Sequence, residues 1–224
     1  MKKDSNVKNA LISAASLVVL AFATPSLAQT TTDPSTSNFD LSGGMDVYDK
    51  YLFDDLYIAN EGVVAQPTVR VTHSSGVYLD GWASIGLESD DGNEFDGTIG
   101  YKKGPVEVLV AYFAIPGPDL IATKAILTIG NLGLHAEHYT YKPENGWRVS
   151  ADYNVQVTEK FSVQPTILYE HGIGLPDIVI GGVNLSYDMS DRLSVNFAGL
   201  VALDQAKNDP RRGAEFSIGL GYHF

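Results

Sequence analysis

The chain has 224 residues, carries 27 acidic against 15 basic side chains, and contains no cysteine. A formal net charge of −12 argues against nucleic acid as a partner, because few basic groups are available to neutralise phosphates. Without cysteine, disulfide bonds cannot stabilise an exported domain, so the fold must gain its stability in another way.

The N-terminus has the order of a secretory signal. Basic residues in "MKKDSNVKN" precede the apolar run "ALISAASLVVLAFAT", and the small-residue stretch "PSLAQ" follows. This order predicts a signal peptide over residues 1–28 that is cleaved after Ala28, with an N-terminal anchor helix as the alternative. Residues 29–37 are rich in Thr, Ser and Pro, which predicts a flexible periplasmic leader.

From residue 38 to residue 224, apolar residues alternate with small or polar ones along much of the chain. In "FSVQPTILY" from Phe161 and in the final "EFSIGLGYHF", bulky apolar residues occupy every second position, with mainly small or polar residues between them. A period of two is typical of β-strands with two different faces. Twelve candidate strands of roughly ten residues follow one another, and this is the length of a tilted strand that crosses a bilayer.

The interruptions between the strands differ in length in a regular way. Every second interruption is short: these are "HSSG", "KKGP", "NLG", "TEK" and "SD". The two longest interruptions, "DDLYIANEG" and "DQAKNDPRRGAE", are among those that alternate with the short ones. Bacterial outer-membrane barrels have short periplasmic turns and longer external loops. The sequence therefore predicts an all-β fold, an antiparallel up-and-down transmembrane β-barrel of twelve strands over residues 38–224, with eight or ten strands as alternatives.

The apolar face of these strands is better suited to lipid than to the core of a soluble sandwich. The opposite face carries charged and polar residues at mid-strand, with little lysine at the edges, as a barrel lumen would. Aromatic residues gather near the strand ends, which predicts two girdles at the membrane interfaces. They are Phe95, Tyr112, Trp147, Tyr169 and Phe216 on the outer side, and Tyr101, Phe161, Tyr187, Tyr222 and Phe224 on the periplasmic side.

The final strand resembles the C-terminal signature of bacterial outer-membrane proteins. It alternates up to Tyr222 and ends on Phe224. The resemblance implies that the barrel-assembly machinery of a Gram-negative cell recognises this strand, and it places the protein in the outer membrane.

A second resemblance covers about residues 45–90, "MDVYDKYLFDDLYIANEGVVAQPTVRVTHSSGVYLDGWASIGLES". An aromatic-rich strand, a loop, a proline-containing strand, a His/Ser/Gly turn and a strand with Tyr, Gly and Trp follow in order. This stretch resembles the TorF-type porin family, which implies a barrel and a pore without naming a substrate. The residues that carry the resemblance are Tyr51, Phe53, Gln66, Pro67, Ser75, Gly76, Tyr78, Gly81, Trp82 and Ser84.

Twelve tilted strands give a backbone radius of roughly 12 Å, so inward side chains leave a narrow passage. An acidic wall in such a passage concentrates cations and repels anions. The sequence therefore predicts a passive, cation-preferring channel for small solutes, with a non-conducting structural or adhesive barrel as the alternative. The expected lumen charges are Asp40, Asp46, Asp80, Glu88, Glu94, Asp96, Glu107, Asp152, Glu170 and Asp188 against Lys50, Arg70, Lys124 and Arg148.

Two ion pairs are expected among these charges. Folding about Ser75 brings Arg70 opposite Asp80, and the hairpin around Glu159 brings Arg148 near Glu170. Unpaired charges inside a barrel are costly, so these pairs would form a constriction or a brace.

Other motifs have simpler explanations than catalysis or metal binding. His73 and Ser75 have the spacing of outer-membrane phospholipase residues, but their position in a turn favours a structural role. "ESDDGNEFDG" lacks the spacing of a calcium loop, and alternation sends His135 and His138 to opposite faces. We therefore expect no enzyme, no cofactor and no metal.

The longest loop contains a basic cluster. Lys207, Arg211 and Arg212 lie in "KNDPRRG" on the predicted external side. Basic side chains can bind lipopolysaccharide phosphates, and a solvated loop is the alternative. The expected partners are thus outer-membrane lipid, lipopolysaccharide, the barrel-assembly machinery, and small solutes or cations.

Overall fold

The fold was analysed in a computed structural model that describes residues 37–52, 58–88, 93–115, 120–141, 144–172, 176–205 and 213–224. Within these ranges, no helix is long and apolar enough to cross a membrane. The predicted signal peptide and nearly all of the predicted leader lie outside the described residues.

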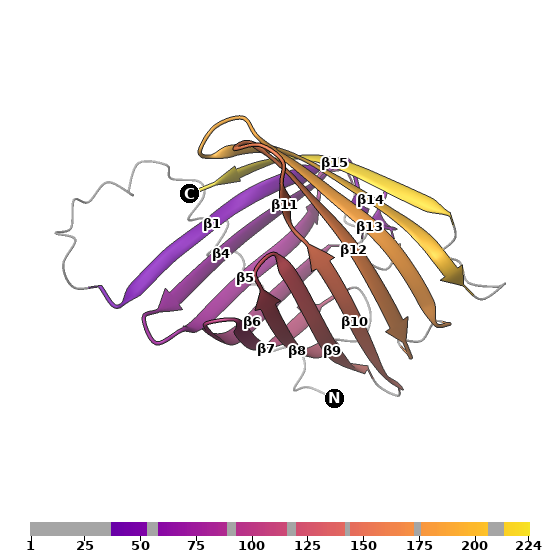
Figure 1. The fold of residues 1–224 in the computed structure, drawn as a ribbon, viewed down its shortest axis with the longest axis horizontal. Coiled ribbons are helices and arrows are strands. Elements are labelled where there is room, and N and C mark those ends of the chain that lie inside the picture. Colours follow the sequence, from indigo (N-terminus) through magenta and orange to yellow (C-terminus); the bar gives the residue numbers. More distant parts are fainter. Residues whose placement is uncertain are drawn as a thin grey trace.

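Twelve long antiparallel strands form the architecture, and the predicted number of twelve is confirmed (Figure 1). Each has nine to thirteen residues, so each repeats the alternating pattern several times. Three short strands, β2 (Tyr51–Leu52), β3 (Ile58–Asn60) and β11 (Val155–Gln156), lie between them. The long strands are β1 (Phe39–Tyr48), β4 (Val64–His73), β5 (Val77–Gly86), β6 (Glu94–Lys103), β7 (Val106–Ala114), β8 (Leu120–Ile129), β9 (Leu132–Tyr141), β10 (Glu144–Tyr153), β12 (Phe161–His171), β13 (Ile178–Asp188), β14 (Leu193–Gln205) and β15 (Ala214–His223).

The sheet closes on itself to form a barrel. Each long strand pairs with the long strands before and after it, and β15 pairs with β1 between Gly44↔His223 and Tyr48↔Gly219. Phe224 extends this seam, because its backbone N–H donates to the carbonyl oxygen of Gly43 at 3.0 Å. Closure removes the exposed sheet edges that a single open sheet would present.

The exterior of the barrel is apolar, as the alternation predicts. Along β15, Phe216, Ile218 and Leu220 are each more than half exposed, while Ser217 between them is only 4 % exposed. The same arrangement recurs on β7, where Val106, Val108 and Val110 are exposed, and on the other strands. A contiguous surface of this kind is unsuited to water and matches the lipid-facing belt of a membrane barrel.

The two ends of the barrel differ. The β4–β5, β6–β7, β8–β9 and β13–β14 connections are tight turns at one end, which is here named the turn end. Gly104 and Gly130 take positive φ in two of these turns, a conformation that glycine adopts without strain. Most of the longer connections, including the one between β1 and β4, lie at the other end, the loop end, as predicted. Two connections depart from this alternation: β9–β10 at the loop end is only residues 142–143, and residues 154–160 join β10 to β12 at the turn end.

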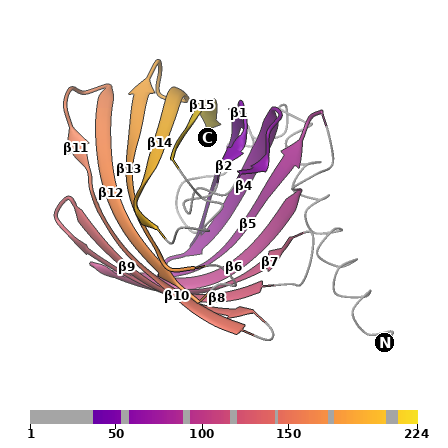
Figure 2. The ribbon, with the colours of Figure 1, turned by 90° about the vertical axis from the view of Figure 1, so that its right-hand side faces the viewer.

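β2, at the start of the first long connection, lies inside the barrel (Figure 2). Tyr51 of β2 is 8 % exposed and packs against the inward-facing Trp82 of β5, with ring centroids 5.6 Å apart. The segment is anchored by Asp49, which accepts hydrogen bonds from the Ser217 hydroxyl and the Ile218 backbone N–H, both at 2.9 Å. The sequence predicted an external loop over "DDLYIANEG" and placed Tyr51 in the aromatic-rich strand before it, and the entry of β2 into the lumen was not predicted.

Candidate functional site: the barrel lumen

A row of alternating charges crosses four neighbouring strands of the lumen wall. Register pairing places Lys124 opposite Glu137, Glu137 opposite Arg148, and Arg148 opposite Glu170. The nitrogen–oxygen distances along the row are 3.2 Å, 3.8 Å and 2.7 Å. Cross-strand neighbours of opposite charge stabilise a sheet, and these are also held away from bulk water. We call these four residues the paired row.

The paired row is shielded from water. The side chains of Arg148 and Glu170 are 15 % and 2 % exposed. Tyr139 adds to the row, because its hydroxyl donates to Glu137 at 2.9 Å and its ring lies 5.3 Å from the Arg148 guanidinium carbon. Loss of one partner would leave a charge in a low-dielectric environment, so the row is suited to bracing the barrel.

A second cluster surrounds Arg70 on β4. Its guanidinium donates two hydrogen bonds of 2.6 Å to the carboxylate of Asp80, the partner that the sequence predicts. The guanidinium carbon also lies 4.1 Å from the centroid of the Tyr78 ring. Tyr78 donates to Glu107 at 2.5 Å, and Lys102 lies 3.5 Å from the same carboxylate. Most of these charges are therefore compensated by a neighbour.

Glycine makes room for this cluster. Tyr78 faces Gly100 across the β5–β6 ladder, and a Cβ atom at residue 100 would collide with the tyrosine ring. Because Gly100 has no side chain, the ring can lie across the neighbouring strand and reach Glu107 on the strand beyond.

An acidic pair lies closer to the loop end on β6. Glu94 is 2 % exposed and accepts a hydrogen bond of 2.6 Å from the Tyr51 hydroxyl. Asp96, two residues along the same face, is in hydrogen-bonding contact with Glu94, so one of the two carboxyl groups has to carry a proton. Among the described residues, no lysine or arginine forms an ion pair with either. We call Glu94 and Asp96 the acidic pair.

The lumen also has an apolar wall that sequence analysis missed. Leu168, Ile178 and Ile180 are almost fully buried although they face inward, and Leu200 packs against them. The inner residues Leu168, Ile180 and Leu200 line a cavity together with Leu52 of β2. The signal in the sequence is "IVIGG" at residues 178–182, where both faces of the strand begin apolar. The first connection therefore reaches toward the β12–β14 wall.

Several polar contacts were also missed. Glu137 and Lys102 were absent from the expected lumen charges, although alternation places Glu137 on the same face as His135. Lys50 forms an ion pair of 3.0 Å with Glu215 of β15. Partners distant in sequence cannot be identified from periodicity, because only the strand register brings them together.

The remaining predicted positions fall as follows. His135 faces inward beside Asp152, whereas His138 is exposed, so the two histidines lie on opposite faces. His73 and Ser75 lie in an exposed turn, with Nδ1 and Oγ 2.8 Å apart. Within the described ranges, no cluster of three potential metal ligands occurs.

Two predicted features stay predictions. Lys207, Arg211 and Arg212 lie outside the described residues. Tyr222 and Phe224 are exposed at the β1–β15 seam, and their role in assembly stays a prediction.

Comparison with known proteins supports the fold. No family model and no curated protein matches the chain. Among solved structures, the chain is similar to a KdgM porin in complex with disordered oligogalacturonate, with a TM-score of 0.55 and 11% identity over 82% of this chain and 98% of that one. It is also similar to a NanC porin, with a TM-score of 0.50 and 8% identity over 82% of this chain and 99% of that one.

At these identities the similarity shows a shared barrel fold and assigns no solute. The barrel has the architecture of outer-membrane porins. The more specific resemblance of residues 45–90 to TorF-type porins stays a prediction.

Proposed function

We propose that the protein is a passive outer-membrane channel that admits small solutes and prefers cations. The observation that carries this proposal is the contrast between the two faces of the closed barrel. Apolar side chains such as Leu220 are more than half exposed on the outside, while the inner face carries ionised and hydrogen-bonding groups. A barrel with this polarity separates lipid from an aqueous lumen.

Cation preference follows from the balance of charge inside the lumen. Ion pairs compensate Asp80, Glu107, Glu137 and Glu170, whereas the acidic pair has no ion-pairing lysine or arginine among the described residues. An uncompensated negative charge in a narrow passage bordered by low-dielectric walls raises the local concentration of cations. The acidic pair is therefore the proposed selectivity element.

The inward position of β2 would make the passage narrow. The Tyr51 hydroxyl donates a hydrogen bond to Glu94 of the acidic pair, and Leu52 lines a cavity on the β12–β14 wall. Ions that cross the loop end would pass between these groups. A constriction beside the uncompensated charge would strengthen its influence, because less water screens it.

The test is conductance of refolded residues 29–224 in a planar bilayer under a salt gradient. Discrete steps with a cation-selective reversal potential would support the proposal. Tyr51→Ala should raise the step size by widening the constriction, and Tyr187→Ala on the outer face serves as the matched control. A barrel that shifts on heating in a gel but never conducts would overturn the channel function.

The second candidate is a non-conducting structural or adhesive barrel. It is favoured by the inward position of β2, together with the pairing of Lys50, Arg70 and Arg148 with lumen carboxylates. In that case the charges would act as a plug. Steady conductance of the wild-type chain would eliminate it.

The remaining partners belong to the same proposal. Phe224 and Tyr222 would present the last strand to the barrel-assembly machinery after export by the signal peptide. Lys207, Arg211 and Arg212 would contact lipopolysaccharide phosphates. No cofactor and no catalytic step are part of this function.

A further inference from the structure

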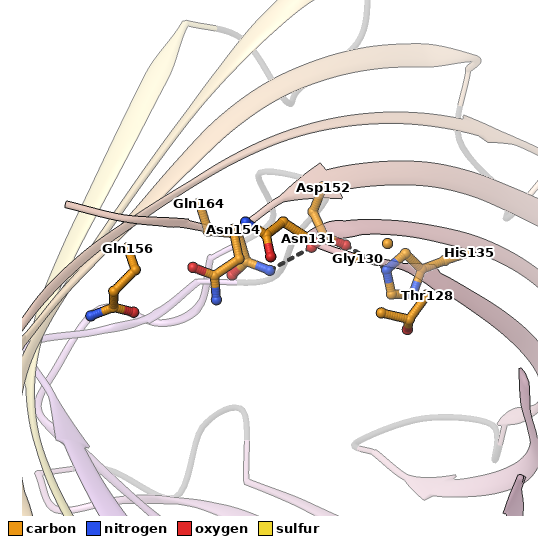
Figure 3. Close-up of a pocket in the computed structure, with 9 residues that line it drawn as sticks. Thr128, Gly130, Asn131, His135, Asp152, Asn154, Gln156 and Gln164 are labelled. Carbon is orange, nitrogen blue, oxygen red and sulfur yellow. Dashed lines mark hydrogen bonds and ion pairs between the residues drawn. The ribbon is translucent and has the colours of Figure 1, made fainter. Parts of the chain in front are cut away.

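A polar cavity lies at the turn end of the lumen (Figure 3). Its volume is about 420 Å³, which is within the range of small-ligand sites. The end of β8, the β8–β9 turn, β9, β10, β11 and β12 all contribute to it. It is lined by Thr128, Gly130, Asn131, Gly133, His135, Asp152, Asn154, Gln156 and Gln164.

Five of the nine lining residues carry an uncharged side-chain group that both donates and accepts hydrogen bonds. Four carboxamides, Asn131, Asn154, Gln156 and Gln164, contribute an NH₂ donor and a carbonyl acceptor each, and Thr128 adds a hydroxyl. In Figure 3, Gln156, Asn154 and Thr128 extend toward the open interior of the barrel. Neither lysine nor arginine belongs to the lining.

The one carboxylate in the lining is already held by protein groups. Asp152 lies 2.6 Å from His135 Nε2 through one oxygen and accepts a hydrogen bond of 2.6 Å from the Gln164 amide through the other. Gly133 faces Asp152 across the ladder, and a Cβ atom at residue 133 would collide with this carboxylate. Glycine therefore leaves space for an ordered Asp152, which fixes the orientation of the Gln164 amide.

The cavity continues into the barrel. His135, Asp152 and Gln164 also line a deeper cavity of about 180 Å³, together with Ser150, Thr166 and Asn184. Leu168, Ile180 and Leu200 form an apolar part of this deeper cavity, and Lys124 also lines it. A solute that leaves the turn-end cavity would thus meet both hydrogen-bonding and aliphatic groups.

We propose that the turn-end cavity is a weak binding site for an uncharged, polyhydroxylated solute, such as a small neutral saccharide, on its way through the channel. The inference rests on the proposed channel function. Vicinal hydroxyl groups both donate and accept, so carboxamides satisfy them without a net charge. The cavity presents no aromatic side chain on which a sugar ring could stack. Affinity is therefore low, as a site that must release its solute requires.

The test is block of single-channel current by maltose, a neutral disaccharide. In wild-type channels, maltose should reduce the current in a saturable manner. The double variant Asn154→Ala/Gln156→Ala should weaken the apparent affinity at least fivefold. The reversal potential should stay unchanged, because neither substitution alters the charge.

The matched control is Asn196→Ala, which removes an inward carboxamide of β14 outside the cavity lining. This variant should retain wild-type block. Equal loss of block in the control and the double variant would overturn the site. So would block by the charged analogues glucuronate or glucosamine without block by maltose.

A separate readout distinguishes failure of the site from failure of the channel. If the refolded barrel is electrically silent, the channel function fails. Maltose would then be titrated into the detergent-solubilised barrel while the side-chain amide signals of Asn154 and Gln156 are followed by NMR. Saturable shifts at these amides would support the site, and unchanged signals would overturn it.

Discussion

The paired row and the acidic pair are two parts of one lumen wall with different electrostatic designs. In the paired row, Arg148 lies between Glu137 and Glu170, and each charge has an opposite neighbour. In the acidic pair, Glu94 and Asp96 have each other and the Tyr51 hydroxyl. Charges that are paired with an opposite charge brace the wall but add little to the electrostatic potential in the lumen. Charges without such a partner add to that potential. Stability and selectivity should therefore respond to different substitutions.

The largest effect is expected in the paired row. Arg148→Met keeps much of the side-chain volume but removes the guanidinium that lies 2.7 Å from Glu170, a side chain that is 2 % exposed. Breaking a buried pair from one side costs roughly 3–5 kcal/mol. We expect a corresponding loss of unfolding free energy, measured by urea titration in lipid vesicles with tryptophan fluorescence.

A double variant isolates the charge from the packing. Arg148→Met/Glu170→Gln removes both charges and should recover part of the lost stability, because residue 170 then carries no buried carboxylate that has lost its contact with Arg148. If the double variant is as unstable as the single one, the row acts through packing and not through charge.

The next effect concerns the acidic pair and should appear in selectivity. Glu94→Gln/Asp96→Asn removes the uncompensated charge while it keeps the side-chain shapes. The cation-to-anion permeability ratio should fall a few-fold, on the order expected for one charge in a low-dielectric passage. Reversal potentials under a salt gradient measure this ratio.

The control removes one carboxylate from an exposed turn, as Glu159→Gln. Because one carboxyl group of the acidic pair already carries a proton, this control removes the same single charge but should leave the reversal potential near the wild-type value. An equal shift in both variants would mean that overall charge, and not the acidic pair, determines selectivity.

A smaller change is expected for Arg70, whose pair with Asp80 is partly exposed. Arg70→Ala leaves Asp80 uncompensated, so cation preference should rise by roughly twofold or less, because water screens the charge. Arg70→Ala/Asp80→Asn should return the reversal potential toward wild type. Unchanged selectivity in the single variant would place Arg70 away from the permeation path.

The two designs also show what a sequence can reveal. The alternation in "EFSIGLGYHF" and the turn lengths predict strands, faces and closure, because lipid and water impose a period of two. The predicted pairs Arg70 with Asp80 and Arg148 with Glu170 follow from counting residues about a short turn, where register is nearly fixed.

The contacts that the sequence did not predict join residues that are far apart along the chain. Lys50 meets Glu215 only because the first and last strands are neighbours in the closed barrel. The entry of Tyr51 into the lumen depends on anchors at Ser217 and Glu94, which no local pattern connects to it. Such contacts form because the barrel closes between β1 and β15. They cannot be predicted from one sequence for which the strand register is unknown.

The smallest predicted effect lies outside the lumen, at the rim of the loop end. Hydrogen bonds from the Tyr169 hydroxyl and His171 hold the pKa of the exposed Asp177 below its ordinary value. Because the pKa is lower in the folded state, this contact contributes stability above the unfolded value of about 3.9 and loses it as the pH falls through the folded pKa. Tyr169→Phe should raise the pKa of Asp177, measured by ¹³C NMR titration.

Tyr187→Phe, a girdle tyrosine at the turn end, is the control and should leave the titration of Asp177 unchanged. Selectivity should not change in either variant, because an exposed carboxylate at the rim is screened by salt over about 10 Å. A shift in reversal potential for Tyr169→Phe would mean that the rim charge reaches the permeation path. The rim would then contribute to cation preference beside the acidic pair, and the contrast between the two parts of the lumen wall would have to include the rim.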